Sequence, residues 1–269
     1  MSMKSLHLII ISLLFSIVTE AATVETVQVF SKSMNKEIPV VIVAPEKSEK
    51  PLRTVYLLHG YGGNANMWLG IKPNLPDIAE RDGLLFVCPD GHNSWYWDSP
   101  KDPSSRYETF VSKELIEYID THYPTLPAKE GRAITGLSMG GHGALWIAFR
   151  HTETFGAAGS SSGGVDIRPF PENWEMDKQL GSLEENRELW DSHTVINQID
   201  KIKNGDLALI VDCGYGDFFF EVNNNFHAKL LENKIDHDYL VRPGVHYGPY
   251  WNNSIDYQIL FFMKYFQKN

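Results

Sequence analysis

The chain has 269 residues, of which 43% are hydrophobic and 12% aromatic, so it can bury one large core and we expect one domain rather than two. Its formal net charge is −10 at pH 7 and it carries no basic run, so we expect no nucleic-acid partner.

The first 22 residues have the composition of a secretory signal peptide. Lys4 precedes an apolar run over residues 8–18, and small residues follow up to Ala22. The run is shorter than the roughly 18 apolar residues that a membrane span needs. We therefore predict a cleaved signal peptide over residues 1–22 and a secreted or periplasmic protein with no stable membrane span after cleavage. An uncleaved N-terminal anchor is the alternative.

Strand-like runs and helical patterns alternate over residues 23–269. The predicted strands are, in chain order, VETVQVFS and IPVVIVAP (a hairpin joined by SMNK), TVYLLHG, GLLFVCPDG, RAITGLS, FGAAGSSSG, DLALIVDCG and HDYLVRPG. The predicted helices are a weak one in MWLGIKPNLPDIAERDG, a strong one over residues 108–123, and others over 139–150, around NNNFHAKLLENK and through 257–266. This alternation indicates an α/β protein with a largely parallel sheet.

Residues 165–200 are the one long segment outside this alternation. The segment is polar and aromatic, and it contains Trp174 and Trp190. We predict an insertion that forms a partial cap over the site, with a connecting helix pair as the alternative.

Two segments match the pattern Gly-X-Ser-X-Gly, namely GLSMG centred on Ser138 and GSSSG centred on Ser161. A nucleophile elbow needs a strand, a sharp turn and then a helix. GLSMG lies between a predicted strand and a glycine-rich helix, whose first N–H groups can stabilise an oxyanion. GSSSG continues into GVDIRPFPENW, which has no helical period. We therefore predict that Ser138 is a nucleophile and that Ser161 is structural.

A serine nucleophile needs a base and an orienting acid, which follow it in this type of fold in the order acid, then histidine. Among the histidines after Ser138, only His246 lies in a glycine-bounded loop directly after the last predicted strand. Asp217 lies beyond the carboxyl end of DLALIVDCG, the side where open α/β sheets place their sites. Asp212, still inside that strand, either braces the loop or is itself the acid.

The oxyanion hole in this architecture takes one N–H from the residue after the nucleophile, here Met139, and one from a loop after an earlier strand. HGYGGN is that loop, because its glycines let backbone amides face a ligand. Tyr61 is the predicted donor and Gly62 the alternative. We predict a structural role for His59, which precedes the nucleophile.

With these pieces in place the chain resembles the esterase D family, a branch of the α/β-hydrolases. That family includes S-formylglutathione hydrolases, tributyrin esterases, secreted feruloyl and acetyl-xylan esterases, and bacterial mycolyltransferases. The matching stretches are LLHGYGGNANMWL, PDGHNSWYWDSP, RYETFVSKELIEYID, ITGLSMGGHGAL, DCGYGDFFFEVNN and GVHYGPYW. They cover nearly all of residues 24–266 in the expected order.

The resemblance implies an α/β-hydrolase fold with an eight-stranded, mostly parallel sheet and helices on both faces. The site residues that it implies are Ser138, Asp217 and His246 as the triad and the amides of Tyr61 and Met139 as the oxyanion hole. It favours Asp217 over Asp212, because the family's acid is the later aspartate of that loop.

The resemblance also places the loop NSWYWDSP beside the acyl pocket. The substrate-binding residues expected from it are Trp95, Tyr96, Trp97 and, from GVHYGPYW, Trp251. Three consecutive aromatic residues are also typical of a packed loop, and that alternative stays open.

The family's sheet order puts the strands of Cys88 and Cys213 about four positions apart. That spacing corresponds to roughly 19 Å, whereas the Cα atoms of a disulfide lie within about 7 Å. We therefore expect two free, buried thiols.

The expected function is a secreted serine carboxylesterase that acts on acetyl or hydroxycinnamoyl esters of carbohydrates, without a metal or an organic cofactor. The alternatives are acyl transfer to a sugar, a thioesterase like S-formylglutathione hydrolase, and a carbohydrate-binding pseudoenzyme. Export argues against a glutathione thioester, which is a cytosolic metabolite. The filled triad positions argue against a pseudoenzyme.

Overall fold

The computed structural model of the chain describes residues 22–268. The predicted signal peptide, residues 1–22, lies outside this part except for Ala22. No helix within residues 22–268 is long and apolar enough to cross a membrane.

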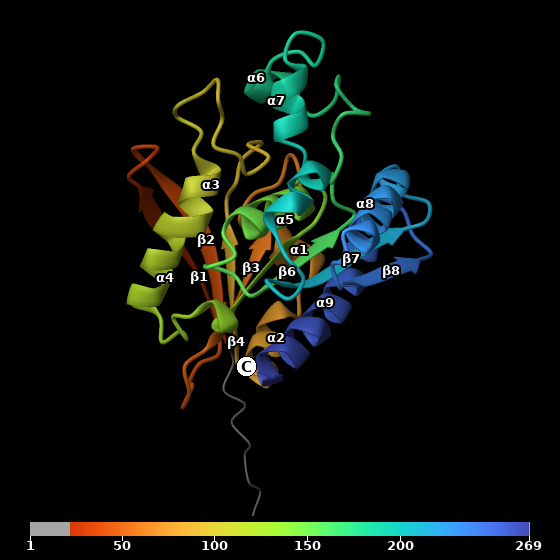
Figure 1. Cartoon of the computed structure of the whole chain (residues 1–269). Helices are drawn as coiled ribbons and strands as arrows, with labels where there is room; N and C mark the ends of the chain where they lie inside the picture. The colour runs from red at the N-terminus through yellow and green to blue at the C-terminus, as the bar shows by residue number, and fades with distance from the viewer. Residues whose placement is uncertain (1–21, 269) are drawn as a thin grey trace, which may run out of the picture.

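Eight strands form one sheet in the order β1-β2-β4-β3-β5-β6-β7-β8 (Figure 1). The strands are β1 (Thr23–Ser31), β2 (Lys36–Ala44), β3 (Arg53–Leu58), β4 (Leu84–Pro89), β5 (Arg132–Gly136), β6 (Ala157–Ser161), β7 (Ala208–Gly214) and β8 (Asp238–Arg242). β2 runs antiparallel to both of its neighbours, and the remaining pairs of neighbouring strands are parallel. The predicted eight-stranded, mostly parallel sheet is confirmed.

The apolar strand sequences bury side chains on both faces of this sheet. In β3, Val55 and Leu57 join the core on one face, and Tyr56 and Leu58 join the core on the other. Successive side chains of a strand point to opposite faces, so a strand that is covered on both sides reads as a continuous apolar run. This explains why the runs in the sequence do not alternate with polar residues.

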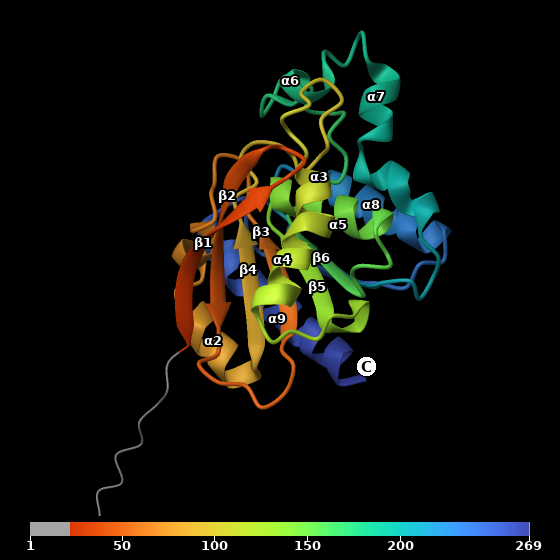
Figure 2. The same ribbon diagram turned by 90° about the vertical axis from the view of Figure 1, so that its left-hand side faces the viewer.

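Helices cover both faces, as expected for this class of fold. The helices are α1 (Met67–Ile71), α2 (Leu75–Asp82), α3 (Tyr107–Thr109), α4 (Leu115–His122), α5 (Met139–Arg150), α6 (Met176–Leu180), α7 (Arg187–Ser192), α8 (Phe220–Glu232) and α9 (Gly248–Lys268), with the π-helical turn η1 (Phe110–Glu114) and the 3-10 helices η2 (Lys129–Gly131) and η3 (Val195–Lys201). α1, α2 and α9 pack on the face of Val55, and α4, α5 and α8 pack on the face of Tyr56. Figure 2 shows α4 and α5 on the side of the sheet nearest the viewer.

Two of the predicted helices are interrupted in the structure. The weak one is divided into α1 and α2 at Lys72, whose conformation is not helical (φ −122°, ψ 75°). Proline at the next position disfavours the helical region for Lys72. The strong one, predicted over residues 108–123, contains the π-helical turn η1 between α3 and α4.

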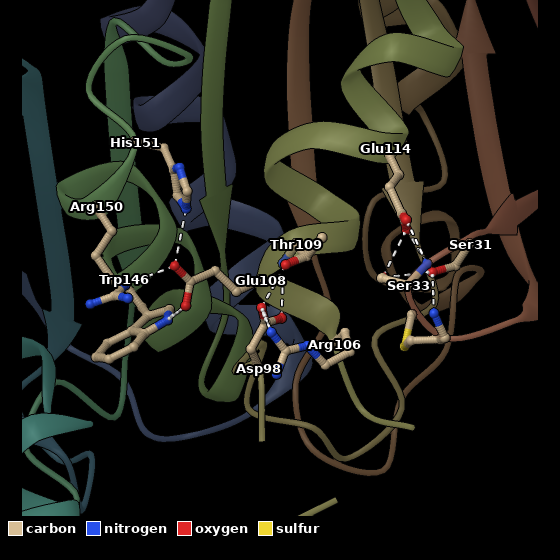
Figure 3. A network of polar contacts seen from close by, with 11 residues as sticks. Ser31, Ser33, Asp98, Arg106, Glu108, Thr109, Glu114, Trp146, Arg150 and His151 are labelled. Atoms are coloured by element: carbon tan, nitrogen blue, oxygen red, sulfur yellow. Dashed lines mark hydrogen bonds and ion pairs between the residues drawn. The ribbon is translucent and has the colours of Figure 1, made fainter. Parts of the chain in front are cut away.

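Two glutamates beside this π-helical turn bind different parts of the fold (Figure 3). Glu108 accepts hydrogen bonds from Trp146 Nε1 and Arg150 Nε of α5, each at 2.8 Å. Glu114 accepts hydrogen bonds from Ser31 Oγ at 2.6 Å and from the N–H of Ser33 at 2.7 Å. The interrupted helix therefore connects the N-terminal hairpin to α5, the helix that follows Ser138.

The insertion predicted over residues 165–200 connects β6 to β7 and carries α6 and α7. Figures 1 and 2 both show these two helices projecting beyond the rest of the fold. Between β6 and α6, the ring of Trp174 packs against Phe218 and Phe219, which follow β7. One end of the insertion therefore lies beside the loop that follows β7.

The two cysteines are free and buried, as predicted. Cys88 lies in β4 and Cys213 in β7, and the sheet order places these strands four positions apart. No disulfide between them is therefore possible in this fold.

Candidate active site

Ser138 occupies the sharp turn between β5 and α5, with φ of 56° and ψ of −119°. A positive φ is strained for a residue with a side chain, and such strain is common at functional sites. Gly140 makes the turn possible, because a Cβ there would lie 2.3 Å from the carbonyl oxygen of Leu58. Met139 begins α5, so its N–H is among the first-turn donors that have no acceptor inside the helix.

The structure brings Ser138, His246 and Asp217 together. Nε2 of His246 lies 2.9 Å from Oγ of Ser138, and Nδ1 lies 2.9 Å from Oδ2 and 3.1 Å from Oδ1 of Asp217. Asp217 also accepts the N–H of Phe219 at 2.8 Å, which fixes its carboxylate. When Nδ1–H donates to Asp217, Nε2 is free to accept the hydroxyl proton of Ser138.

Two glycine-containing loops place Asp217 and His246 side by side. The N–H of Gly216 donates to the carbonyl oxygen of Gly244 at 2.9 Å, so the loop after β7 pairs with the loop after β8. A Cβ on Gly214 would lie 2.5 Å from that same oxygen, so only glycine permits this approach.

The loop HGYGGN lies beside the nucleophile. A Cβ on Gly60 would lie 3.4 Å from Cβ of Ser138. The N–H of Gly62 donates to Oδ1 of Asn93 at 2.8 Å, so it is already used. This favours the N–H of Tyr61 over that of Gly62 as the donor that faces a substrate.

His59 is buried and braces this loop, in keeping with its predicted structural role. Its Nε2 accepts the N–H of Gly91 at 2.8 Å, and its Nδ1 lies 2.8 Å from the carbonyl oxygen of Gly60. Its backbone N–H donates to the hydroxyl of Tyr96 at 3.0 Å.

Three of the four expected substrate-binding residues lie in the core instead. Trp95, Tyr96 and Trp97 are each no more than 1% exposed. Tyr96 packs against α5, where a Cβ on Gly143 would lie 2.3 Å from its ring. The three rings therefore pack in the core against α5 and its surroundings, and the structure shows the packed loop that was the alternative.

The rings of Trp95 and Trp97 meet the imidazole of His142 edge to face, at 5.2 and 5.1 Å between centroids. Burial lowers the pKa of His142 to about 3, and Nδ1 lies 3.0 Å from the carbonyl oxygen of Gly164. His142 is therefore a neutral core residue and not a base for Ser138.

Aromatic side chains surround His246, and one of them, Phe218, was not among the expected substrate-binding residues. The ring of Phe218 lies 4.2 Å from the imidazole, centroid to centroid, and Trp174 stacks on Phe218 at 5.7 Å. Trp251, the fourth expected residue, meets His246 edge to face at 4.9 Å. Phe218 is 50% exposed, so this surface is open to a ligand. The three consecutive phenylalanines that follow Asp217 in the sequence are the feature that could have indicated Phe218.

The insertion also touches the oxyanion loop. Tyr61 Oη donates to Oε2 of Glu175 at 2.9 Å, and burial together with this bond raises the pKa of Tyr61. Trp174 and Glu175 both have positive φ, at 53° and 54°. A strained turn of the insertion therefore lies between the oxyanion loop and the aromatic residues beside His246.

Ser161 and Asp212 hydrogen-bond each other, whereas Asp217 is the carboxylate that contacts His246. Ser161 ends β6, is buried, and donates from Oγ to Oδ1 of Asp212 at 3.0 Å. Asp212 is fully buried in β7, and burial raises the pKa of its carboxyl group. The structure thus brings Asp217, and not Asp212, to the histidine.

No group of three or more His, Cys, Asp or Glu side chains among residues 22–268 could hold a metal ion. The chemistry available at the site is that of a hydroxyl, an imidazole, a carboxylate and backbone amides.

The fold and this hydrogen-bonded series define an α/β-hydrolase with the geometry of a serine hydrolase. Comparison with known proteins gives the family: residues 31–262 match the Esterase family, and the chain belongs to it. The resemblance to esterases that the sequence motifs indicated is thereby confirmed.

Three relatives show the range of this similarity. An acetyl esterase from Caldicellulosiruptor saccharolyticus is 26% identical over 254 residues, which cover 84% of this chain and 92% of the relative. The diacylglycerol acyltransferase/mycolyltransferase Ag85B from Mycolicibacterium smegmatis is 28% identical over 215 residues, 72% of this chain and 64% of the relative. The solved structure of a ferulic acid esterase is 26% identical with a TM-score of 0.78, covering 91% of this chain and 98% of that one.

Proposed function

We propose that this protein is an exported carboxylesterase that hydrolyses acetyl or hydroxycinnamoyl esters of carbohydrates. Ser138 is the nucleophile, His246 the base and Asp217 the orienting acid. The observation that carries the proposal is the unbroken series of hydrogen bonds from Asp217 through both ring nitrogens of His246 to Oγ of Ser138.

The reaction proceeds in two steps through an acyl-enzyme. Ser138 Oγ attacks the ester carbonyl while its proton passes to Nε2 of His246, and the N–H groups of Tyr61 and Met139 stabilise the oxyanion. The alcohol leaves with that proton. Water, deprotonated by His246, then attacks the acyl carbonyl and releases the acid and free Ser138.

A polar pocket beside the oxyanion loop supports an alcohol part that is rich in hydroxyl groups. Its volume is about 250 Å³, and its lining includes Lys36, His92, Asn93, Tyr107, Glu175 and Gln179. Asn93 and Glu175 hydrogen-bond Gly62 and Tyr61, so the pocket adjoins the oxyanion loop. Many hydrogen-bonding groups in a small pocket suit a sugar ring.

The aromatic surface beside His246 supports the acyl part of the proposal. Phe218 and Trp251 flank the imidazole, and an apolar or aromatic acyl group on Ser138 would lie against them. The names of two relatives, an acetyl esterase and a ferulic acid esterase, are consistent with this choice. Export is supported by the charge, length and small-residue exit of residues 1–22.

Acyl transfer to a sugar is the second candidate, because one relative is named as an acyltransferase/mycolyltransferase. Both reactions share the acyl-enzyme and differ in whether water or a sugar hydroxyl accepts the acyl group. Incubation with p-nitrophenyl butyrate and free trehalose or xylobiose, followed by mass spectrometry for an acylated sugar, separates the two. The same triad could also cleave a thioester, and the proposed export argues against a glutathione thioester. The filled triad positions argue against a carbohydrate-binding pseudoenzyme.

The proposal is tested by hydrolysis of p-nitrophenyl acetate, p-nitrophenyl butyrate and methyl ferulate. We expect the wild-type protein to cleave these esters, Ser138→Ala to be inactive, and Ser161→Ala to remain active. A dead Ser161→Ala variant beside an active Ser138→Ala variant would show that the nucleophile is assigned to the wrong motif. Appearance of the processed chain outside the cytoplasm, starting near residue 23, tests export.

A further inference from the structure

A buried carboxylate beneath the active site takes no part in the proposed reaction. Asp212 lies in β7, five residues before Asp217, and its side chain is fully excluded from solvent. A charged group in the interior is costly unless hydrogen bonds satisfy its oxygens. The partners of Asp212 therefore indicate what the carboxylate holds in place.

Four side chains from three other elements surround this carboxylate. Ser161 of β6 donates to Oδ1 at 3.0 Å, and Ser254 of α9 donates to Oδ2 at 2.6 Å. Gln258 of α9 donates from Nε2 to Oδ2 at 2.6 Å, and Arg242 Nη2 of β8 lies 3.5 Å from Oδ1. Asp212 thus joins β6, β7, β8 and α9 at one point.

The same cluster reaches the nucleophile through two contacts. The carbonyl oxygen of Ser161 accepts the N–H of Ser138 at 3.0 Å. Oε1 of Gln258 accepts the hydroxyl of Thr135, which lies in β5 three residues before Ser138. Displacement of Ser161 or Gln258 would therefore shift the backbone that carries the nucleophile.

The cluster reaches the base through Arg242, which ends β8 four residues before His246. Nη1 of Arg242 donates to Oδ1 of Asn253 at 2.6 Å, and the guanidinium faces the rings of Tyr250 and Tyr257 at 5.2 and 4.2 Å. These three residues belong to α9, which begins directly after the loop of His246. Asp212 therefore contacts the chain on both sides of that loop, at Arg242 and at Ser254.

We propose that Asp212 is a positioning residue, whose hydrogen bonds to Ser161, Ser254, Gln258 and Arg242 set the alignment of Ser138 with His246. The inference rests on the proposed function, because it takes Ser138 as the nucleophile and His246 as its base. It also gives the second Gly-X-Ser-X-Gly segment a role: Ser161 supplies one of the four donors. A misplacement of about 1 Å is enough to slow a reaction about 100-fold, so a buried anchor at this point has a measurable effect.

The test separates the number of competent sites from the rate at which each site reacts. Diisopropyl fluorophosphate forms a P–O bond with Ser138 Oγ, fluoride leaves, and the hydroxyl proton passes to His246. The fraction of chains modified at completion, measured by mass spectrometry, counts competent sites. The rate constant of modification reports on the alignment of Ser138 and His246 without any contribution from substrate affinity.

For Asp212→Asn, we expect modification to completion with a rate constant that is about 10- to 100-fold lower than for the wild type. The kcat for p-nitrophenyl acetate falls by a similar factor, and KM changes less than about 2-fold. Ser254→Ala, which removes a single donor, shows the same pattern with a smaller fall and serves if Asp212→Asn does not fold. Glu108→Gln is the matched control, because Glu108 is a buried carboxylate with several donors that does not contact the triad loops.

Incomplete modification of both variants at the wild-type rate constant would overturn the proposal, because it would mean that Asp212 only keeps the chain folded. A wild-type rate constant at full modification would overturn it as well. Failure of the proposed function has a different signature, namely hydrolysis that persists in Ser138→Ala.

Discussion

The ring of Phe218 lies over the imidazole of His246, with 4.2 Å between the ring centroids and an interplanar angle of 39°. Half of the Phe218 side chain is nevertheless exposed, although the residue lies in the loop next to the orienting acid. An aromatic ring in this place leaves the hydrogen bonds of His246 intact and offers its remaining surface to the substrate.

We therefore expect Phe218→Ala to affect esters with an aromatic acyl group selectively. The kcat/KM for methyl ferulate should fall about 10-fold, corresponding to an aromatic pair of about 1.4 kcal/mol, and that for p-nitrophenyl acetate should change less than about 2-fold. The melting temperature should stay close to that of the wild type, because the side chain is half exposed. Tyr215→Ala is the control, since Tyr215 is 60% exposed in the same loop. Equal losses on both esters would rule out a selective role for Phe218.

Asp217→Asn should reduce kcat by about 10⁴-fold while the protein stays folded. An amide at this position would present an N–H₂ group toward Nδ1 of His246, and the imidazole would then carry its proton on Nε2. In that tautomer Nε2 cannot accept the proton of Ser138. Steady-state kinetics on p-nitrophenyl acetate measure the loss, and Asp212→Asn provides the comparison. If Asp212→Asn were the more damaging of the two, the acid would be Asp212.

The parts of the site that the sequence predicted depend on local chain geometry. Ser138 follows a short apolar strand and precedes a glycine-rich helix, and both features can be recognised in a segment of about fifteen residues. Asp217 and His246 each follow a strand, so the topology alone carries them to one edge of the sheet. The alternation of strands and helices indicated a largely parallel sheet, and the resemblance to the esterase D family indicated its eight strands and the unpaired cysteines.

The parts of the site that the sequence did not predict depend on the direction in which individual side chains point. NSWYWDSP is a loop, yet Trp95 and Tyr96 have φ of 56° and 59° and point into the core beneath α5. Trp174 meets Phe218 only because the insertion folds back across the end of β7, a contact between residues 44 positions apart in the chain. The hydrophobic pattern of the sequence indicates neither the positive φ angles of Trp95 and Tyr96 nor the path of the insertion across the end of β7.

Protonation of Glu108 should limit stability in acid. Burial raises the pKa of Glu108, but hydrogen bonds from His151 and Arg150 and the charge of Arg150 outweigh it and lower the pKa to about 2, from an ordinary value of 4.5 (Figure 3). A lowered pKa in the folded state contributes stability that is complete above about pH 4.5 and is lost as the pH falls toward 2. The shift corresponds to about 3 kcal/mol.

Urea unfolding between pH 6 and pH 2.5 measures this contribution. We expect Glu108→Gln to be less stable than the wild type at pH 6 and to show a shallower decline in acid. Glu117→Gln, an exposed position on α4, should follow the wild-type curve. Parallel curves for wild type and Glu108→Gln would mean that Glu108 does not titrate with a lowered pKa.

Gly140 and Gly70 should respond in opposite directions to the same added methyl group. A Cβ on Gly140 would lie 2.3 Å from the carbonyl oxygen of Leu58 and 2.6 Å from that of His59, and both obstacles are backbone atoms that cannot rotate away. Gly140→Ala should therefore lower stability by about 1–3 kcal/mol and displace the turn of Ser138, with a loss of activity of at least about 100-fold.

Gly70 lies in α1, is exposed, and has nothing within 4 Å of an added Cβ. Gly70→Ala should raise stability by about 0.5–1 kcal/mol and leave esterase activity unchanged. Urea unfolding and p-nitrophenyl acetate hydrolysis measure both variants, and a fully active Gly140→Ala protein of wild-type stability would show that the elbow does not require glycine at that position.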